Sequence, residues 1–230
     1  MRNFDQSDAM PSLPPVQPFR PAPRALSLRL AGALVAAALV FALAACGERT
    51  PTLPKLAPDA VVLAFGDSLT YGTGADPKES YPAVLERRIG RKVVSAGVPG
   101  ETSAQGLARL PGVLEATRPQ LVVLIHGGND FLRRLDERQA AANLDAMARL
   151  AAERGAGVVI LGVPKPGLFP SSASFYAEVA RAARAPYDGD TLPAILADNE
   201  LKSDPIHPNA KGYAKLAEAV AALLARAKAI

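Results

Sequence analysis

A serine at the end of an apolar run is the first residue of this sequence that suggests chemistry. The stretch "VVLAFGDSLTYGTGA", residues 61–75, ends a strand-like run in Gly-Asp-Ser-Leu and continues with glycines at 72 and 74. A serine hydroxyl is a weak nucleophile at neutral pH and needs an adjacent base before it attacks a carbonyl carbon. Ser68 is therefore a candidate nucleophile for acyl transfer. The alternative is that the segment is only a tight connection between two elements.

The base for such a serine has to be one of two histidines, since the chain has no others. His207 lies in "SDPIHPNAKGY", three residues after Asp204, and the prolines of this segment predict a rigid loop. A carboxylate at that spacing can accept from one ring nitrogen and leave the other for Ser68; the alternative is that Asp204 and His207 only cap the last helix. We expect His126, in "LIHGGND", to be a partly buried histidine that is hydrogen-bonded to backbone and at most lines the pocket.

Acyl transfer also needs N–H donors directed at the oxygen that becomes negatively charged. The candidates are the backbone N–H of Ser68 at a helix start, the N–H of Gly100 in "GVPGET" and the side-chain amide of Asn129 in "GGND". Taken singly, the glycines of these segments read as turn residues. Because the three groups follow three successive predicted strands, we expect them to meet at one edge of a sheet.

The elements that must position these residues alternate along the chain. Strand-like runs occupy 61–65, 92–97, 121–128 and 157–163, and helix-spaced segments occupy 81–90, 103–117, 137–155, 172–185 and 210–230. Apolar strands separated by amphipathic helices predict an α/β fold with a parallel sheet covered on both faces. Such sheets carry their sites at the carboxyl ends of the strands.

Charge, cysteine content and motifs exclude several classes of function. The formal net charge is +4, and it falls to +2 without residues 1–45, which hold four Arg and two Asp. That charge, with no basic stripe interleaved with aromatic residues, argues against a nucleic-acid partner. One cysteine permits no disulfide within the chain, and no Cys/His cluster has zinc-site spacing. A P-loop and a dinucleotide fingerprint are absent, and Thr70 in place of a second glycine excludes the Gly-x-Ser-x-Gly elbow.

The N-terminal part of the sequence predicts a targeting signal. Arginines at 20, 24 and 29 precede a sixteen-residue apolar run over 30–45, which leads into Cys46; this is typical of a secretory signal. The run ends in "LAAC", which resembles the bacterial lipobox and implies that Cys46 is lipidated and anchors the mature protein to a membrane. The alternative is an uncleaved membrane helix, although the run is short of the roughly 20 residues that span a bilayer. Residues 1–19 are polar and Pro-rich, and Met10 is an alternative start.

The residues around Cys46 carry two further expectations. Gly47, where an aspartate would favour retention at the inner membrane, favours the periplasmic side of the outer membrane in a Gram-negative cell envelope. Residues 46–59 contain three prolines and no periodicity, which predicts an extended tether. The folded domain is then expected over residues 60–230.

Taken together, these segments resemble the SGNH, or GDSL-type, hydrolase family. "FGDSLTYG" resembles its first block, "AGVPGETS" its second, "GGND" its third and "DPIHPNAKGY" its fifth, over residues 61–225. The resemblance implies Ser68 as the nucleophile and Asp204 and His207 as the rest of a triad. It also implies Gly100, Asn129 and the Ser68 N–H as oxyanion donors, with no metal and no organic cofactor.

Within this family the chain is most similar to the bacterial arylesterase, acyl-CoA thioesterase and lysophospholipase branch, although Ser95 stands where many members have Asn. This implies a flavodoxin-like three-layer α/β/α sandwich with a central parallel sheet and a shallow, open site. We expect a monomeric serine esterase that hydrolyses short- to medium-chain acyl esters or lysophospholipids through an acyl-serine intermediate. The alternatives are a carbohydrate O-acetylesterase or acyltransferase of the same fold, and a non-catalytic lipid-anchored binding protein.

Overall fold

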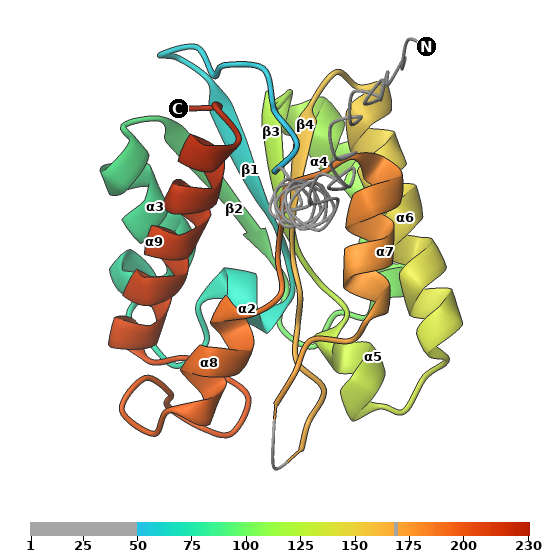
Figure 1. Cartoon of the computed structure of the whole chain (residues 1–230), viewed down its shortest axis with the longest axis vertical. Helices are drawn as coiled ribbons and strands as arrows, with labels where there is room; N and C mark the ends of the chain where they lie inside the picture. The colour runs from blue at the N-terminus through green and yellow to red at the C-terminus, as the bar shows by residue number, and fades with distance from the viewer. Residues whose placement is uncertain (1–49, 168–169) are drawn as a thin grey trace, which may run out of the picture. The chain divides into compact units, whose positions relative to one another are not determined.

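The centre of the molecule is a parallel β-sheet. The computed structural model of the chain describes residues 50–167 and 170–230, so the predicted signal segment and Cys46 lie outside the described residues. The described part forms one five-stranded sheet in the order β2-β1-β3-β4-β5, with every pairing parallel (Figure 1). The strands are β1 Val61–Gly66, β2 Lys92–Gly97, β3 Leu121–Ile125, β4 Gly157–Leu161 and β5 Tyr187–Asp188.

Helices cover both faces of this sheet (Figure 1). On one face lie α3 Tyr81–Ile89, α8 Thr191–Ala197 and α9 Ala210–Arg226; on the other lie α4 Ser103–Thr117, α6 Glu137–Glu153 and α7 Phe175–Ala183. The shorter elements are α2 Ser68–Tyr71, the 3-10 turn η1 Pro77–Glu79 and α5 Gly128–Leu132. The predicted three-layer α/β/α sandwich is confirmed. None of the helices in the described part of the chain is both long and apolar enough to cross a bilayer.

The strand order alone predicts where on the sheet a functional site lies. From β1 the chain passes to β2 on one side and then to β3 on the other. The carboxyl ends of β1 and β3 therefore flank the point where the winding reverses, which is the usual ligand position in open parallel sheets. Both strands are almost wholly buried, whereas the edge strand β2 remains partly exposed. Their continuous apolar runs follow from this double coverage.

The helix start expected at Ser68 is present as α2, but its length and three other short elements were not predicted. β5 has only two residues, and α2, α5 and α8 have four, five and seven. Segments this short show no helical or alternating periodicity, so tertiary contacts decide their conformation. The apolar runs that begin at residues 121 and 157 also continue beyond β3 and β4, because the residues after these strands are buried in loops.

The folded domain begins earlier than residue 60. The N–H of Leu53 donates to the carbonyl of Ala227 and that of Leu56 to Ala229, both at 2.8 Å. The Leu56 side chain is part of the core. The described part of the segment that we expected to be a tether is therefore bound to the residues that follow α9. The prolines alone predicted a tether, whereas Leu53 and Leu56 fix this segment to the domain.

Candidate active site

Ser68 is the first residue of α2, two residues after the end of β1. Asp67 caps this helix, and its Oδ1 accepts from the N–H of Leu69 at 3.1 Å. The Ser68 N–H has no intrahelical carbonyl to bind, because it is the first of the helix. Gly66 permits the tight approach of β1 to β3, since a Cβ there would collide with the carbonyl oxygen of Ile125. The turn thus presents both the hydroxyl and the N–H of Ser68 at the edge of the sheet.

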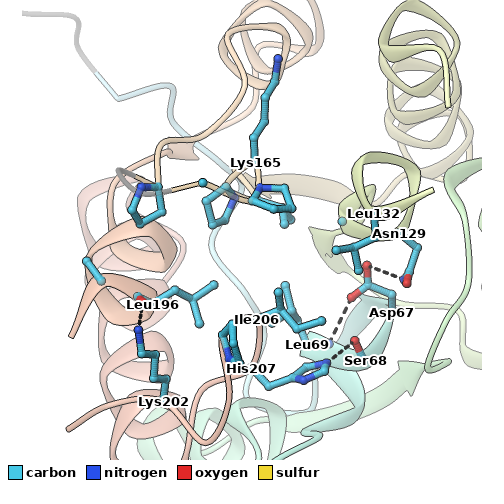
Figure 2. Close-up of a pocket in the computed structure, with 18 residues that line it drawn as sticks. Asp67, Ser68, Leu69, Asn129, Leu132, Lys165, Leu196, Lys202, Ile206 and His207 are labelled. Atoms are coloured by element: carbon cyan, nitrogen blue, oxygen red, sulfur yellow. Dashed lines mark hydrogen bonds between the residues drawn. The ribbon is translucent and has the colours of Figure 1, made fainter. Parts of the chain in front are cut away.

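A hydrogen-bonded chain joins Ser68, His207 and Asp204 (Figure 2 shows its first link). The Nε2 of His207 lies 2.9 Å from the Oγ of Ser68, and its Nδ1 lies 2.7 Å from Oδ2 of Asp204. A carboxylate opposite Nδ1 requires a proton on that nitrogen, which leaves Nε2 as an acceptor facing the serine. Burial raises the pKa of Asp204, but hydrogen bonds from the His207 ring and from backbone N–H groups outweigh it and lower that pKa below its usual value.

The loop that carries this pair is held by its own contacts. Oδ1 of Asp204 accepts from the N–H of Ile206 at 2.8 Å and from the N–H of His207 at 2.9 Å. The residue that caps α9 is Asn209, whose Oδ1 accepts from the N–H of Gly212 at 3.1 Å. The alternative in which Asp204 and His207 only cap the last helix is therefore wrong.

The three candidate oxyanion donors come from three segments at the same edge of the sheet: the start of α2, the loop after β2 and the first turn of α5. Asn129 lies in the first turn of α5, and its Nδ2 donates to the carbonyl of Glu101 at 3.0 Å and lies 3.5 Å from Oδ2 of Asp67. Gly100 has a φ of +78°, which favours glycine, and its carbonyl accepts from Nη2 of Arg133 at 2.7 Å. Asn129 lines the same pocket as Ser68, whereas Gly100 lies beside it without lining it.

The pocket in front of Ser68 is mainly apolar and has a volume of about 310 Å³. Its walls come from α2, α5, the end of α8, the chain after β4 and the chain between α8 and α9. Its apolar members include Val163 and, as Figure 2 shows, Leu69, Leu132, Leu196 and Ile206. At its rim, the Nζ of Lys202 donates to the carbonyl of Leu196 at 2.9 Å. Lys165 points away from the pocket in Figure 2 and pairs with Glu137 at 2.7 Å. The segments 163–167 and 196–207 form much of this wall, and sequence reasoning assigned them no side-chain role apart from Asp204 and His207.

His126 does not line the pocket. It is completely buried, more than we expected, and its Nδ1 accepts from the backbone N–H of Gly127 at 2.9 Å, as predicted. Its Nε2 lies 3.1 Å from Glu101, which Arg109 also binds. Sequence reasoning missed Glu101 and Arg109. The available signals were an acidic residue directly after Gly100 and a single arginine in the otherwise apolar segment "GLARLPGVL".

Two further observations concern the titratable side chains: the pKa of Asp67 and the absence of a metal-ligand cluster in the described residues. Asp67 is 1% exposed, and burial raises its pKa above the usual value despite nearby His126 and His207 and the backbone N–H groups that it binds. Among residues 50–167 and 170–230, no three His, Cys, Asp or Glu side chains are grouped as metal ligands would be.

Relatives of known activity align with most of this chain. It is 34% identical to esterase TesA of Pseudomonas aeruginosa over 179 residues, which are 73% of this chain and 89% of TesA. It is 28% identical to the arylesterase of Vibrio mimicus over 199 residues, or 82% and 95% of the two chains. It is also 30% identical to thioesterase 1/protease 1/lysophospholipase L1 of Escherichia coli K12 over 160 residues, or 64% and 75%.

Solved structures show the same architecture. The crystal structure of TesA matches with a TM-score of 0.66 at 31% identity, over 73% of this chain and 99% of that chain. The SGNH-hydrolase family esterase AlinE4 matches with a TM-score of 0.57 at 31% identity, over 75% and 98%. Residues 64–215, which include Ser68, Asn129 and His207, match the GDSL-like lipase/acylhydrolase family. The chain therefore belongs to the GDSL-like lipase/acylhydrolase family and is an enzyme with esterase activity.

Proposed function

We propose that this esterase uses Ser68 as its nucleophile and forms an acyl-serine intermediate. The observation that carries the proposal is the chain of contacts from Ser68 Oγ through the His207 ring to Asp204, with links of 2.9 and 2.7 Å. Ser68, at one end of this series of contacts, lines an apolar pocket that can receive the acyl or alcohol part of an ester. A positioned base, an ionised carboxylate behind it and N–H donors at the same edge are the groups that acyl transfer needs.

In the first step, Nε2 of His207 takes the proton of Ser68 as Oγ forms a bond to the ester carbonyl carbon. The carbonyl oxygen becomes an oxyanion, which the N–H groups of Ser68 and Gly100 and the side-chain amide of Asn129 stabilise. The bond to the leaving alcohol then breaks, and His207 returns the proton to its oxygen. Water repeats the sequence on the acyl-serine, releases the acid and restores the Ser68 hydroxyl.

The substrate class that fits best is a short- to medium-chain acyl ester or a lysophospholipid. A pocket of about 310 Å³ lies at the lower end of the range of roughly 300–1,000 Å³ for small-molecule sites. Its leucine, valine and isoleucine lining favours an aliphatic group. A chain with no Trp offers little for stacking a sugar ring, which argues against a carbohydrate O-acetylesterase.

The test is a p-nitrophenyl ester series from acetate to palmitate, with the wild type, Ser68→Ala and the control Ser174→Ala. Ser174 is an exposed serine at the start of α7 whose hydroxyl makes no capping bond. We expect Ser68→Ala to lower kcat by roughly 10⁴- to 10⁶-fold while its circular dichroism spectrum is unchanged, and Ser174→Ala to match the wild type. Near-wild-type turnover by folded Ser68→Ala would overturn the assignment. The chain-length optimum distinguishes an acetylesterase from a lipid hydrolase.

We also propose that lipid on Cys46 anchors the mature enzyme, as a monomer, to the periplasmic side of the outer membrane. Support comes from the basic stretch, the apolar run and the "LAAC" sequence ahead of Gly47. The test compares fractions of cells that express the full chain or Cys46→Ser. We expect the wild type in outer-membrane fractions and the variant outside them. A variant that stays equally membrane-bound would instead support an uncleaved membrane helix.

A further inference from the structure

A buried ionic cluster lies next to the proposed oxyanion hole. The Glu101 side chain is 6% exposed and receives two hydrogen bonds from Arg109, Nε to Oε1 at 2.8 Å and Nη2 to Oε2 at 2.7 Å. The completely buried His126 places its Nε2 3.1 Å from Oε2 of the same carboxylate. Because Nδ1 of His126 accepts from the N–H of Gly127, the ring proton is on Nε2 and is donated to Glu101.

This cluster is built into the packing of α4 against β1, β2 and the loop that follows β3. Arg109 on α4 also donates to the carbonyl of Ala96 in β2 at 3.0 Å, and its guanidinium carbon lies 4.3 Å from the ring centre of Phe65 in β1. Gly106, one turn earlier on α4, lies so close to His126 that a Cβ there would collide with Nε2. The imidazole thus reaches Glu101 through a space that only glycine leaves open.

Two of the proposed oxyanion donors depend on Glu101. Gly100 is its neighbour in the chain, so the orientation of the loop that carries the Gly100 N–H is tied to the Glu101 side chain. The carbonyl of Glu101 accepts from Asn129, and His126 stands three residues before Asn129 with two glycines between them. Glycines restrict the backbone little, so the loop needs such outside contacts to hold Asn129 in one place.

We propose that Glu101, clamped between Arg109 and His126, is a positioning residue that sets the separation of the Gly100 N–H and the Asn129 amide and thereby their reach to the oxyanion. The inference rests on the proposed function, in which these two groups stabilise the oxyanion. None of the three clamped side chains lines the pocket. The cluster therefore acts through Gly100 and Asn129 and not on the substrate itself.

The Glu101 carboxylate of the clamp is ionised at neutral pH. Burial raises the pKa of Glu101, but the hydrogen bonds from Arg109 and His126 and the charge of Arg109 outweigh it and bring that pKa to about 2. Asp67, on the other side of Asn129, contacts the amide only at 3.5 Å. The main acceptor that orients Asn129 is accordingly the Glu101 carbonyl.

The experiment compares two substitutions of His126 in the purified enzyme. His126→Leu removes the donor to Glu101, whereas His126→Gln keeps an amide N–H that can reach it. The readouts are kcat, KM and the inhibition constant of an alkyl trifluoromethyl ketone. Ser68 Oγ attacks the carbonyl carbon of the ketone while the serine proton passes to His207. The ketone oxygen becomes the oxyanion of a tetrahedral adduct and occupies the same oxyanion hole.

We expect His126→Leu to lower kcat by about 10²-fold, the effect of a misplacement of about 1 Å, with KM changed less than about threefold. The inhibition constant should rise by a comparable factor, because only transition-state contacts are lost. His126→Gln should recover most of kcat. The control Leu114→Ala removes a buried side chain from α4, the helix that carries Arg109. It should lower thermal stability and leave kcat and inhibitor affinity unchanged per folded molecule.

The outcomes separate this inference from the proposed function. Unchanged kcat and inhibitor affinity in folded His126→Leu would overturn the inference, as would losses that Leu114→Ala reproduces. Should His126→Leu not fold, Glu101→Gln provides the test, since it keeps the side-chain shape and removes the charge; we expect the same fall in kcat and inhibitor affinity, and wild-type values would overturn the inference. Activity in Ser68→Ala would instead overturn the proposed function.

Discussion

Replacing Asp204 with Asn tests how far His207 depends on its carboxylate. One oxygen of Asp204 accepts from the N–H groups of Ile206 and His207, and the other faces Nδ1 of the ring. An Asn can keep the first set of contacts, but its amide nitrogen opposite Nδ1 can only donate. The ring proton must then move to Nε2, where it faces Ser68. An imidazole in that form cannot accept the serine proton.

The size of the effect follows from the exposure of the pair. Two charges about 4 Å apart interact by about 4 kcal/mol at a protein surface and about 1 kcal/mol in water. The Asp204 side chain is 43% exposed and the His207 side chain 13%, so we place the lost stabilisation of the imidazolium between these limits, which is roughly 5- to 10³-fold in rate. The wrong tautomer adds to this loss. We therefore expect kcat to fall by about 10²- to 10⁴-fold.

The assay is steady-state hydrolysis of the best p-nitrophenyl ester by the wild type, Asp204→Asn and Asp204→Ala, with a thermal melt of each. Asp204→Asn should keep a melting temperature close to that of the wild type and a KM within about threefold, because the loop contacts remain. Asp204→Ala should lose stability as well as rate, since it removes both sets of contacts. A loss of less than about tenfold in folded Asp204→Asn would refute the reasoning that His207 needs this carboxylate.

Further predictions concern two glycines of α4 and one buried carboxyl group. Gly106→Ala should destabilise the fold by about 1–3 kcal/mol because the new Cβ meets the His126 ring. Gly112→Ala, whose new Cβ would have nothing within 4 Å, should stabilise the fold by about 1 kcal/mol. Denaturant midpoints of both variants equal to that of the wild type would contradict both predictions. The raised pKa of Asp67 means that the folded state holds its proton more tightly than the unfolded state, so stability is lost as pH rises from its ordinary pKa towards the raised value. Asp67→Asn, which keeps an oxygen for the Leu69 N–H, should thus gain melting temperature over the wild type at pH 8 but not at pH 4, and a larger gain at pH 4 would contradict this sign.

The parts of the site that the sequence predicted share one feature: local spacing or a general topological rule connects them. Asp204 and His207 are three residues apart in a loop, so their contact needed no knowledge of the fold. Ser68 and Asn129 are far apart in the chain, but each follows a strand, and parallel strands bring their carboxyl ends to one edge. The strands and long helices were predicted for a similar reason, because continuous burial and helical spacing are visible over five or more residues.

The missed features depend on contacts between residues that no pattern relates. The approach of Arg109 and His126 to Glu101 is set by how closely α4 packs on the strand ends, and that distance depends on the absence of a Cβ at Gly106. The binding of Leu56 to the residues after α9 likewise joins the two ends of the domain.

The sequence by itself determined the fold class, the family resemblance, the nucleophile candidate and the pairing of Asp204 with His207, since each of these rests on residue types at short or regular spacing. Only the tertiary structure decided where the domain begins and which side chains wall the pocket. It alone also placed a buried carboxylate beside the segments that carry Gly100 and Asn129. The physical reason is that side-chain packing at contacts distant in sequence fixes these features, and packing is decided by the shapes that meet, not by the order in which they occur along the chain.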